Sequence, residues 1–443
     1  MIPANDVRLG YHEDFRRLGA ALPGAGLPWL REQRAEAIDR FMEQGFPTLK
    51  HEDWKYTDAR PIAMRRFGLA TGSVRLDPQE IAPYAWSGHQ LVFVDGRYAP
   101  ALSRPGVLPR GVRLLSLTAA LTEEPQMLES WLGREAVPAR HGFEALNTAF
   151  MQDGAVVRIG RGVAIEEPIH LLFLASGAPE SAVYWRNLIV AEAGSRATVI
   201  ETYASLDGAA HMTNAITEVT LESNASLEHY RLGRESDTAY HIGGTRAHLA
   251  RDSRYASHAV TLGARLARHE LDAVLDAEGA ECLLNGFYAT RGQQHVDNHT
   301  RIEHRAPHGT SREWYKGVLD DRSRAVFSGR IVVHPQAQRT DAEQANHHLL
   351  LSREAEADSR PQLEIYANDV KCAHGATAGQ LDETALFYLR SRGLDEARAR
   401  GLLVYAFAAD VLARMRLVPL RRALEHQLAG RLLAVESVQE LLT

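Results

Sequence analysis

A cysteine and a histidine lie close together in a strand-like stretch, Pro361 to Gly379, which reads PQLEIYANDVKCAHGATAG. If Val370 to His374 is extended, Cys372 and His374 point the same way, because residues two apart share a face of a strand. A thiolate and an imidazole can bind iron or zinc, but two ligands do not complete such a site. The pair is therefore either half of a site shared with another subunit or structural. A lone cysteine in a β core is commonly a small buried hydrophobic residue.

A second group of potential ligands is a set of histidines: His295, His299, His304, His308, His334, His347, His348 and His374. In QQHVDNHTRIEH, His295, Asp297 and His299 alternate and would line one face of a strand, and such side chains can bind Zn²⁺ or Fe²⁺. On an extended strand, however, His295 and His299 are about 13 Å apart, too far to share one ion. A polar ladder is the favoured interpretation. A metal-dependent enzyme is the rival hypothesis, and metal analysis of the isolated chain would test it.

Motifs for nucleotide and hydrolytic chemistry are missing from the sequence. It contains no GxxxxGK[ST], GxSxG or HExxH. If ATP drives the function of this protein, another chain hydrolyses it.

The composition is that of an ordinary globular protein, with 443 residues, 45% hydrophobic residues and a net charge of −6. That charge gives no electrostatic reason to expect nucleic acid or an anionic membrane as a partner. The N-terminus lacks the pattern of a signal peptide, and no run of about 18 apolar residues predicts a transmembrane helix. Two cysteines fit a reducing compartment, so the sequence predicts a cytoplasmic protein.

The elements that position Cys372 and His374 belong to a long β region with a weak internal repeat. A small polar turn followed by an extended segment recurs at Gly194, Asn224, Asp252 and Gly279. Such spacing favours stacked coils, because rungs of a solenoid bury together the faces that each could not bury alone. A β-sandwich or barrel with evenly spaced turns is the alternative.

Helical patterns flank this β region, and they predict three parts. Residues 1–85 form an N-terminal helical region, which includes a polar loop anchored by Trp54 and Tyr56. Residues 86–380 form the β core, with a hairpin turn at Asp95-Gly96 and a mostly helical insertion at about 114–151. Residues 381–443 form a helical tail.

In this tail, Asp382 and Asp395 can cap the first two helices, and a short last helix is expected near Val435. The first helix carries Phe387, Tyr388 and Arg390 close together. Part of that surface could serve a partner, although docking on the chain's own β core is the default expectation.

Several long blocks resemble the SufB/SufD family of iron–sulfur cluster assembly proteins. They are YKGVLDDRSRAVFSGRIVV, Tyr315 to Val333, and QRTDAEQANHHLLLS, Gln338 to Ser352. Two further blocks are similar to the SufD branch of that family: EIYANDVKCAHGATAGQLDETALFYLRSRGL, Glu364 to Leu394, and HEDWKYTD, His51 to Asp58. The likeness covers essentially the whole chain.

The resemblance implies a mainly β fold, a right-handed parallel β-helix core between N-terminal and C-terminal helical regions. It also implies a non-enzymatic scaffold subunit of a SufBCD complex, which pairs end to end with the paralogue SufB. The C-terminal helices would hold the ABC-type ATPase SufC, in keeping with the missing nucleotide motif. A homodimer is plausible when SufB is absent, because the end faces are similar.

Residue by residue, Cys372 and His374 match the KC-x-HGAT motif of the family, which is complete here. The resemblance places both by the interface with SufB and makes His374 a candidate ligand of a transient iron–sulfur cluster shared with SufB. No cofactor is expected to be bound stably by this chain alone. Phe387, Tyr388 and Arg390 fall in the region that binds the ATPase. A second rival is a purely structural adaptor, with the cluster held entirely by the partner.

Overall fold

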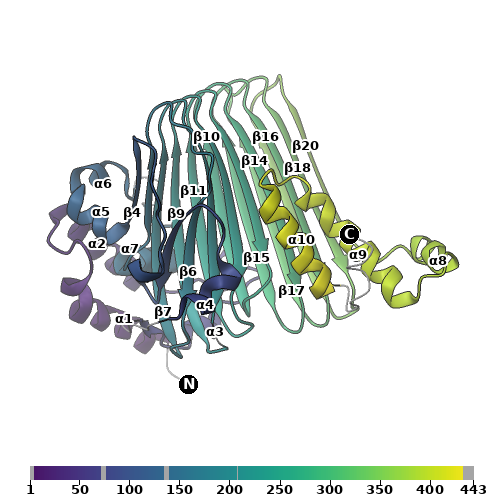
Figure 1. Cartoon of the computed structure of the whole chain (residues 1–443), viewed down its shortest axis with the longest axis horizontal. Helices are drawn as coiled ribbons and strands as arrows, with labels where there is room; N and C mark the ends of the chain where they lie inside the picture. The colour runs from purple at the N-terminus through teal and green to yellow at the C-terminus, as the bar shows by residue number, and fades with distance from the viewer. Residues whose placement is uncertain (1–3, 71–75, 134–138, 207, 433–443) are drawn as a thin grey trace.

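The computed structural model describes residues 4–70, 76–133, 139–206 and 208–432, and a stack of parallel strands forms its centre (Figure 1). Successive strands alternate between two sheets, so that each turn of chain adds one strand to each sheet. The result is a parallel β-solenoid of about seven turns. The predicted fold class, mainly β with helices at both ends, is confirmed, and the alternative of a sandwich or barrel is wrong.

We call the two sheets sheet A and sheet B. In sheet A the strands, in spatial order, are β4 (Val112–Ser116), β5 (Ala155–Ile159), β7 (Ser181–Ala191), β9 (His211–Leu221), β11 (Tyr240–Leu249), β13 (Leu266–Leu275), β15 (His295–His304), β17 (Arg324–Val333) and β19 (Glu356–Ile365), with β1 (Gly68–Leu69) beside β7. In sheet B they are β3 (Arg97–Tyr98), β2 (His89–Val94), β6 (Ile169–Ala175), β8 (Arg196–Ser205), β10 (Ser226–Arg234), β12 (Arg254–Thr261), β14 (Glu281–Thr290), β16 (Thr310–Leu319), β18 (Asp341–Leu350) and β20 (Lys371–Gly379).

The turns that precede the strands of sheet B stack on one another. Their central residues share a left-handed backbone: Gly194 (φ 69°), Asn224 (φ 61°), Asp252 (φ 55°) and Gly279 (φ 74°). Glycine, asparagine and aspartate are the residues that tolerate this conformation best. Each turn also bonds to the next, as when the Asn224 N–H donates to the Arg251 carbonyl over 2.9 Å. The predicted repeat is therefore the succession of these turns.

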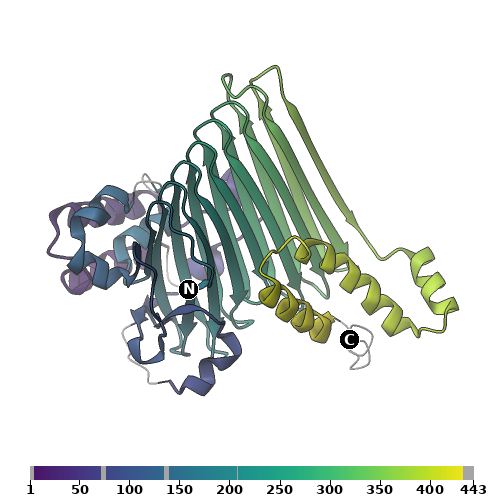
Figure 2. The same ribbon diagram turned by 45° about the horizontal axis from the view of Figure 1, so that its top comes forward.

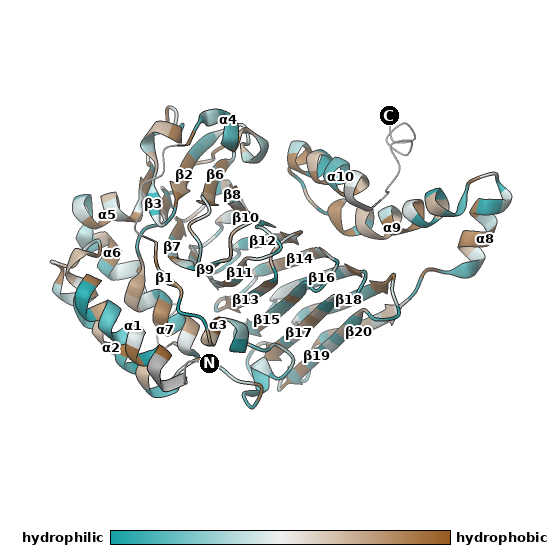
Figure 3. Ribbon diagram, turned by 90° about the horizontal axis from the view of Figure 1, so that it is seen from below, coloured by the Kyte–Doolittle hydropathy of each residue, from teal (hydrophilic) through white to brown (hydrophobic). Residues whose placement is uncertain are grey.

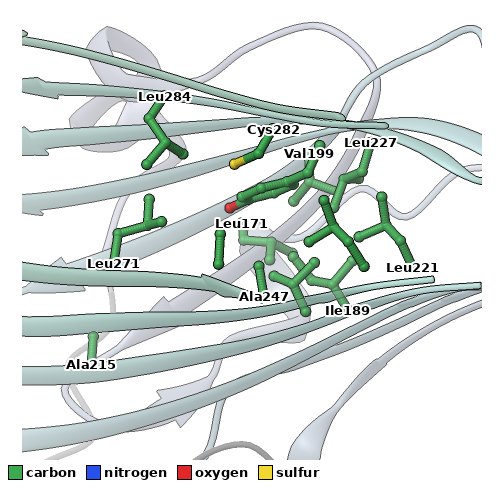
Figure 4. Close-up of a cluster of buried hydrophobic side chains, with 14 of the residues drawn as sticks. Leu171, Ile189, Val199, Ala215, Leu221, Leu227, Ala247, Leu271, Cys282 and Leu284 are labelled. Carbon is green, nitrogen blue, oxygen red and sulfur yellow. The ribbon is translucent and has the colours of Figure 1, made fainter. Parts of the chain in front are cut away.

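Apolar side chains from both sheets fill the space between them, which we call the lumen (Figure 4). Strands of sheet B contribute Leu171, Val199, Leu227 and Leu284, and those of sheet A contribute Ile189, Leu221 and Leu271. Cys282 also lies here and is buried. Burying a leucine or isoleucine side chain contributes roughly 1.5–3 kcal/mol, so the apolar side chains of the lumen contribute substantially to the stability of the stack.

The N-terminal helices cover the beginning of the solenoid (Figure 1). They are α1 (Ala4–Leu18), α2 (Pro28–Gln44), α3 (Arg60–Ala63) and α4 (Pro78–Ile81), and the insertion adds α5 (Leu117–Glu123), α6 (Pro125–Trp131) and α7 (Gly142–Phe150). Trp54 anchors the loop before α3, as predicted. It is buried, stacks on Phe143 at 5.4 Å between ring centroids and lies 4.0 Å from the Arg268 guanidinium on sheet A.

The predicted hairpin is also present, since β2 and β3 pair antiparallel across Asp95 and Gly96, both with positive φ. Within the described residues, no helix combines the length and the apolar character that crossing a bilayer would require.

The C-terminal helices are α8 (Glu383–Ser391), α9 (Glu396–Leu412) and α10 (Val418–Leu432). The caps predicted at Asp382 and Asp395 are confirmed, because their carboxylates accept from the backbone N–H of Thr384 and Arg398. Helix α9 lies on the outer face of sheet B, where Lys316 pairs with Asp410 at 2.7 Å. The short helix expected near Val435 lies outside the described residues.

Candidate functional site at the open end of the solenoid

The solenoid ends in two strands that each have a neighbour on one side only. Among the described residues, β19 pairs with β17 and β20 pairs with β18, and no strand covers their outer edges. Figure 2 shows this end of the stack, with β20 running on toward α8. Such edges expose backbone N–H and C=O groups that can pair with another chain.

Cys372 and His374 lie on β20, at this open end. Their register partners on β18 are Ala342 and Gln344, each 1% exposed in the lumen. Partners in register on parallel strands project to the same side, so Cys372 and His374 both face the lumen. They are about 7 Å apart along the strand. The two thus share a face, as their spacing predicts.

The environments of the two side chains differ. Cys372 is half-buried and packs against the apolar cluster of the lumen, and His374 is exposed. Burial raises the pKa of the Cys372 thiol, while the backbone of Ala342 acts in the opposite direction. The thiol of the isolated chain is therefore protonated at neutral pH, and it becomes a good ligand only where a metal or another subunit favours the thiolate.

Below His374 the lumen contains a polar pair that sequence reasoning missed. Gln344 and Glu313 follow His374 in the same register column, on β18 and β16, and both are buried. The Gln344 Nε2 donates to the Glu313 Oε2 over 2.6 Å. Only the register between strands about one turn apart places these residues together, and the sequence alone does not give that register.

The histidines of β15 do not assemble into a metal site. His295, Asp297 and His299 share one face of β15, as predicted, and the structure shows that this is the outer face of sheet A. The Thr57 hydroxyl lies 3.0 Å from the His295 Nε2, and the His299 Nε2 lies 3.0 Å from the Asp297 carboxylate. Burial lowers the pKa of His295 to about 4. These contacts form a polar ladder that joins the N-terminal loop to sheet A.

Two other histidines face the lumen and pair with hydroxyl groups. The His304 Nε2 lies 2.9 Å from the Ser311 hydroxyl, and the His348 Nε2 lies 2.7 Å from the Tyr288 hydroxyl. Burial lowers the pKa of each to about 4, so both are neutral at physiological pH. They stabilise the lumen as uncharged hydrogen-bonding groups.

One group of potential ligands does come together, on the outer face of sheet A. His141, Glu144 and Glu270 place one ligand atom each within 4.8 Å of one another. Arginines already neutralise both carboxylates: Arg140 and Arg246 contact Glu144, and Arg140 also pairs with Glu270 at 2.9 Å. A cation here would have to displace these guanidinium groups, so the cluster is a buried ion network rather than a metal centre.

The other predicted surface lies on α8. Phe387 and Tyr388 are 74% and 57% exposed, and Arg390 lies 3.6 Å from Glu396. Helix α8 packs mainly on α9 and extends beyond the solenoid, so the default expectation that it docks on the β core is wrong (Figure 3). It has no apolar stripe of buried residues with which to dock, since no α8 side chain is buried. A groove of about 420 Å³ lies between α8 and the end of β18.

Comparisons with known protein families agree with this architecture. The family model described as "SUF system FeS cluster assembly, SufBD core domain" matches residues 173–407, and that of the SufBD protein N-terminal region matches residues 6–171. A solenoid with helices at both ends, covered by these two models, defines a SufBD-type protein. The chain belongs to the SufBD family of iron–sulfur cluster assembly proteins.

Among individual relatives, the chain is similar to the iron–sulfur cluster assembly protein SufD of Escherichia coli, with 33% identity over 87% of this chain and 89% of the relative. A SufBD family protein of Synechocystis is 34% identical over 91% of each chain. The SufD of Bacillus subtilis is 26% identical over 87% of this chain and 90% of its own length.

Proposed function

We propose that this chain is a non-catalytic scaffold subunit of a cytoplasmic SufBCD complex. In this proposal its open solenoid end pairs with a SufB-like paralogue, and its C-terminal helices bind a SufC-like ABC ATPase. The complex assembles nascent iron–sulfur clusters and passes them on, so the cluster is cargo rather than a resident cofactor. The family membership and the missing nucleotide motif support this assignment.

The proposal rests mainly on the open end of the solenoid, where, among the described residues, unpaired strand edges and an incomplete set of metal ligands occur together. The edges of β19 and β20 have no strand partner among the described residues, and the same strand β20 presents Cys372 and His374. A partner that continues the stack would cover the edges and could add the missing ligands. His374, exposed and two residues from the thiol, can then present a ring nitrogen to an iron held by the partner.

Helix α8 offers a connection between the ATPase and this site. Only residues 380–382 separate the end of β20 from the beginning of α8. A SufC-like dimer that forms when ATP binds would move α8, and the last strand would follow. The geometry at Cys372 and His374 would thereby depend on the nucleotide state.

Replacing His374 by alanine tests the ligand role. We expect His374→Ala to leave the complex assembled, because the side chain is exposed, but to lower cluster content about tenfold or more. The measurement is co-purification with the SufB-like and SufC-like subunits, then anaerobic reconstitution followed by visible absorption. His248→Ala is the matched control, since this histidine lies on the outer face of the same solenoid, 25% exposed. Full maturation in His374→Ala would overturn the ligand role.

The two rivals give different results in the same preparation. A metal-dependent enzyme would hold a stoichiometric ion in the isolated chain, whereas the polar ladder of β15 leaves the histidines bonded to protein groups. A purely structural adaptor would show identical cluster spectra with and without His374.

A further inference from the structure

A buried polar atom in the lumen lacks a hydrogen-bond partner directly behind His374. Within the described part of the chain, the Gln344 Oε1 has no partner, although the Nε2 of the same amide is bonded to Glu313. Both side chains are at least 99% buried, since Gln344 is 1% exposed and Glu313 0%. An unsatisfied buried polar atom is costly, so such an atom calls for a partner that completes it.

The structure holds the Gln344 amide in a defined place. Its Nε2 donates to the Glu313 Oε2 over 2.6 Å, on the side of the lumen away from the open end. On the opposite sheet, Gly329 makes room for it, because a Cβ there would lie 2.1 Å from the Gln344 Nε2. With the nitrogen engaged by Glu313, the amide oxygen is left as an acceptor. The next residue in the register column, toward the open end, is His374.

We propose that Gln344 and Glu313 are positioning residues for His374: the Gln344 Oε1 accepts the N–H of the imidazole, and Glu313 fixes the orientation of the Gln344 amide. This arrangement determines which ring nitrogen of His374 carries the proton and which one is free at the open end. Metal-binding histidines generally use their second nitrogen in this way. The purpose of the arrangement rests on the proposed function, whereas the hydrogen-bond chain itself does not.

The titratable side chains near Glu313 are uncharged at neutral pH. The Glu313 carboxyl acts electrostatically on Tyr315 and Cys282, and burial raises the pKa of both. Neither carries a charge at neutral pH. Among the described residues no arginine, lysine or histidine pairs with Glu313, so the Gln344 amide is its principal partner.

The tautomer of His374 is the direct readout. In the full-length isolated chain, labelled with ¹⁵N in its histidine rings, long-range ¹H–¹⁵N correlation spectra report the proton on each ring nitrogen, and the signal missing from His374→Ala assigns His374. One hydrogen bond should shift its tautomer ratio about fivefold from that of the exposed His308. We expect Gln344→Met, which keeps the length but not the oxygen, and Glu313→Leu to abolish that shift.

The matched control is Asn346→Ala, on the same strand and facing the same lumen, with Ala376 rather than His374 as register partner. It should leave the ratio unchanged. A ratio equal to that of His308 in the unaltered chain overturns the proposal even if Gln344→Met does not fold. If the shift in the His374 tautomer ratio persists in Gln344→Met, the proposal is also overturned. If the shift persists in Glu313→Leu, Glu313 is not one of the positioning residues. These outcomes involve no partner and no cluster, so they are separate from failure of the proposed function.

Discussion

Glu313 is a carboxyl group buried in the lumen between the two sheets. Burial raises its pKa to about 7, against the opposing effects of the Gln344 amide and the Thr300 hydroxyl. Its neighbours in the column contribute no positive charge, unlike the carboxylates on the outer face of sheet A, which lie among arginines. At physiological pH this residue is therefore divided between its neutral and charged forms.

This raised pKa makes stability depend on pH. Because the folded chain holds the Glu313 proton more tightly than the unfolded chain, the stability is fully present below the unfolded pKa and is lost as pH rises through about 7. The loss between about pH 4.5 and about pH 8 is on the order of 3 kcal/mol. Glu313→Gln should reduce the pH dependence of the unfolding free energy by that amount.

Urea unfolding at the two pH values measures the difference. Glu343→Gln is the matched control, because Glu343 is on β18 but 47% exposed on the outer face. If Glu313→Gln and Glu343→Gln behave alike, Glu313 does not titrate as stated.

At the scale of elements, α8 differs from every other helix of eight or more residues that the structure describes. It leaves two aromatic side chains in solvent, and none of its side chains is buried. The sequence predicted the helix and its cap, because both are local features. The sequence did not predict that α8 stays off the β core. The position of α8 depends on where α9 meets sheet B, and that contact joins residues far apart in the sequence, such as Lys316 and Asp410.

Phe387 is the residue of α8 that we expect to matter most for the ATPase. Phe387→Ser should weaken capture of the SufC-like subunit about tenfold or more, because exposed aromatic residues often dominate binding. The unfolding free energy of the chain itself should change by no more than about 0.5 kcal/mol, since the side chain is 74% exposed. Titration of the two subunits by calorimetry gives the affinity. Val107→Ser, at a 95% exposed position elsewhere, should bind normally, and equal loss in both variants would contradict the assignment.

The turns show why the solenoid itself could be predicted. A left-handed turn residue is a local requirement, and Gly194, Asn224, Asp252 and Gly279 meet it at nearly regular intervals. Later turns use His308 and Arg339, with φ of 61° and 59°, which give no such signal, and there the repeat is hard to follow in the sequence. The pairing of Gln344 with Glu313 could not be predicted in this way, because it depends on the register between β16 and β18 and not on the sequence of either strand alone.

For the whole molecule, the open end is the feature that we expect to set the assembly state. Ala376 faces the lumen on β20 and is exposed there. If two chains associate through these ends when the paralogue is absent, Ala376→Arg places a charge in the contact and should weaken a homodimer about tenfold or more. Sedimentation velocity over a range of concentrations measures it. An unaltered dimer in Ala376→Arg would locate the contact elsewhere, for example on α8.

The short link from β20 to α8 has a mechanical consequence. A pull on α8 along the direction of β20 loads all the hydrogen bonds between β20 and β18 at once, in shear, and the strand resists. A pull across the sheet loads them one after another, from Gly379 back toward Lys371, and the strand peels. Among the described strands β20, like β19, has only one neighbour, and because β20 is the strand joined to α8, peeling would begin there. The direction of force on α8 thus decides whether His374 stays in place or is released before Cys372.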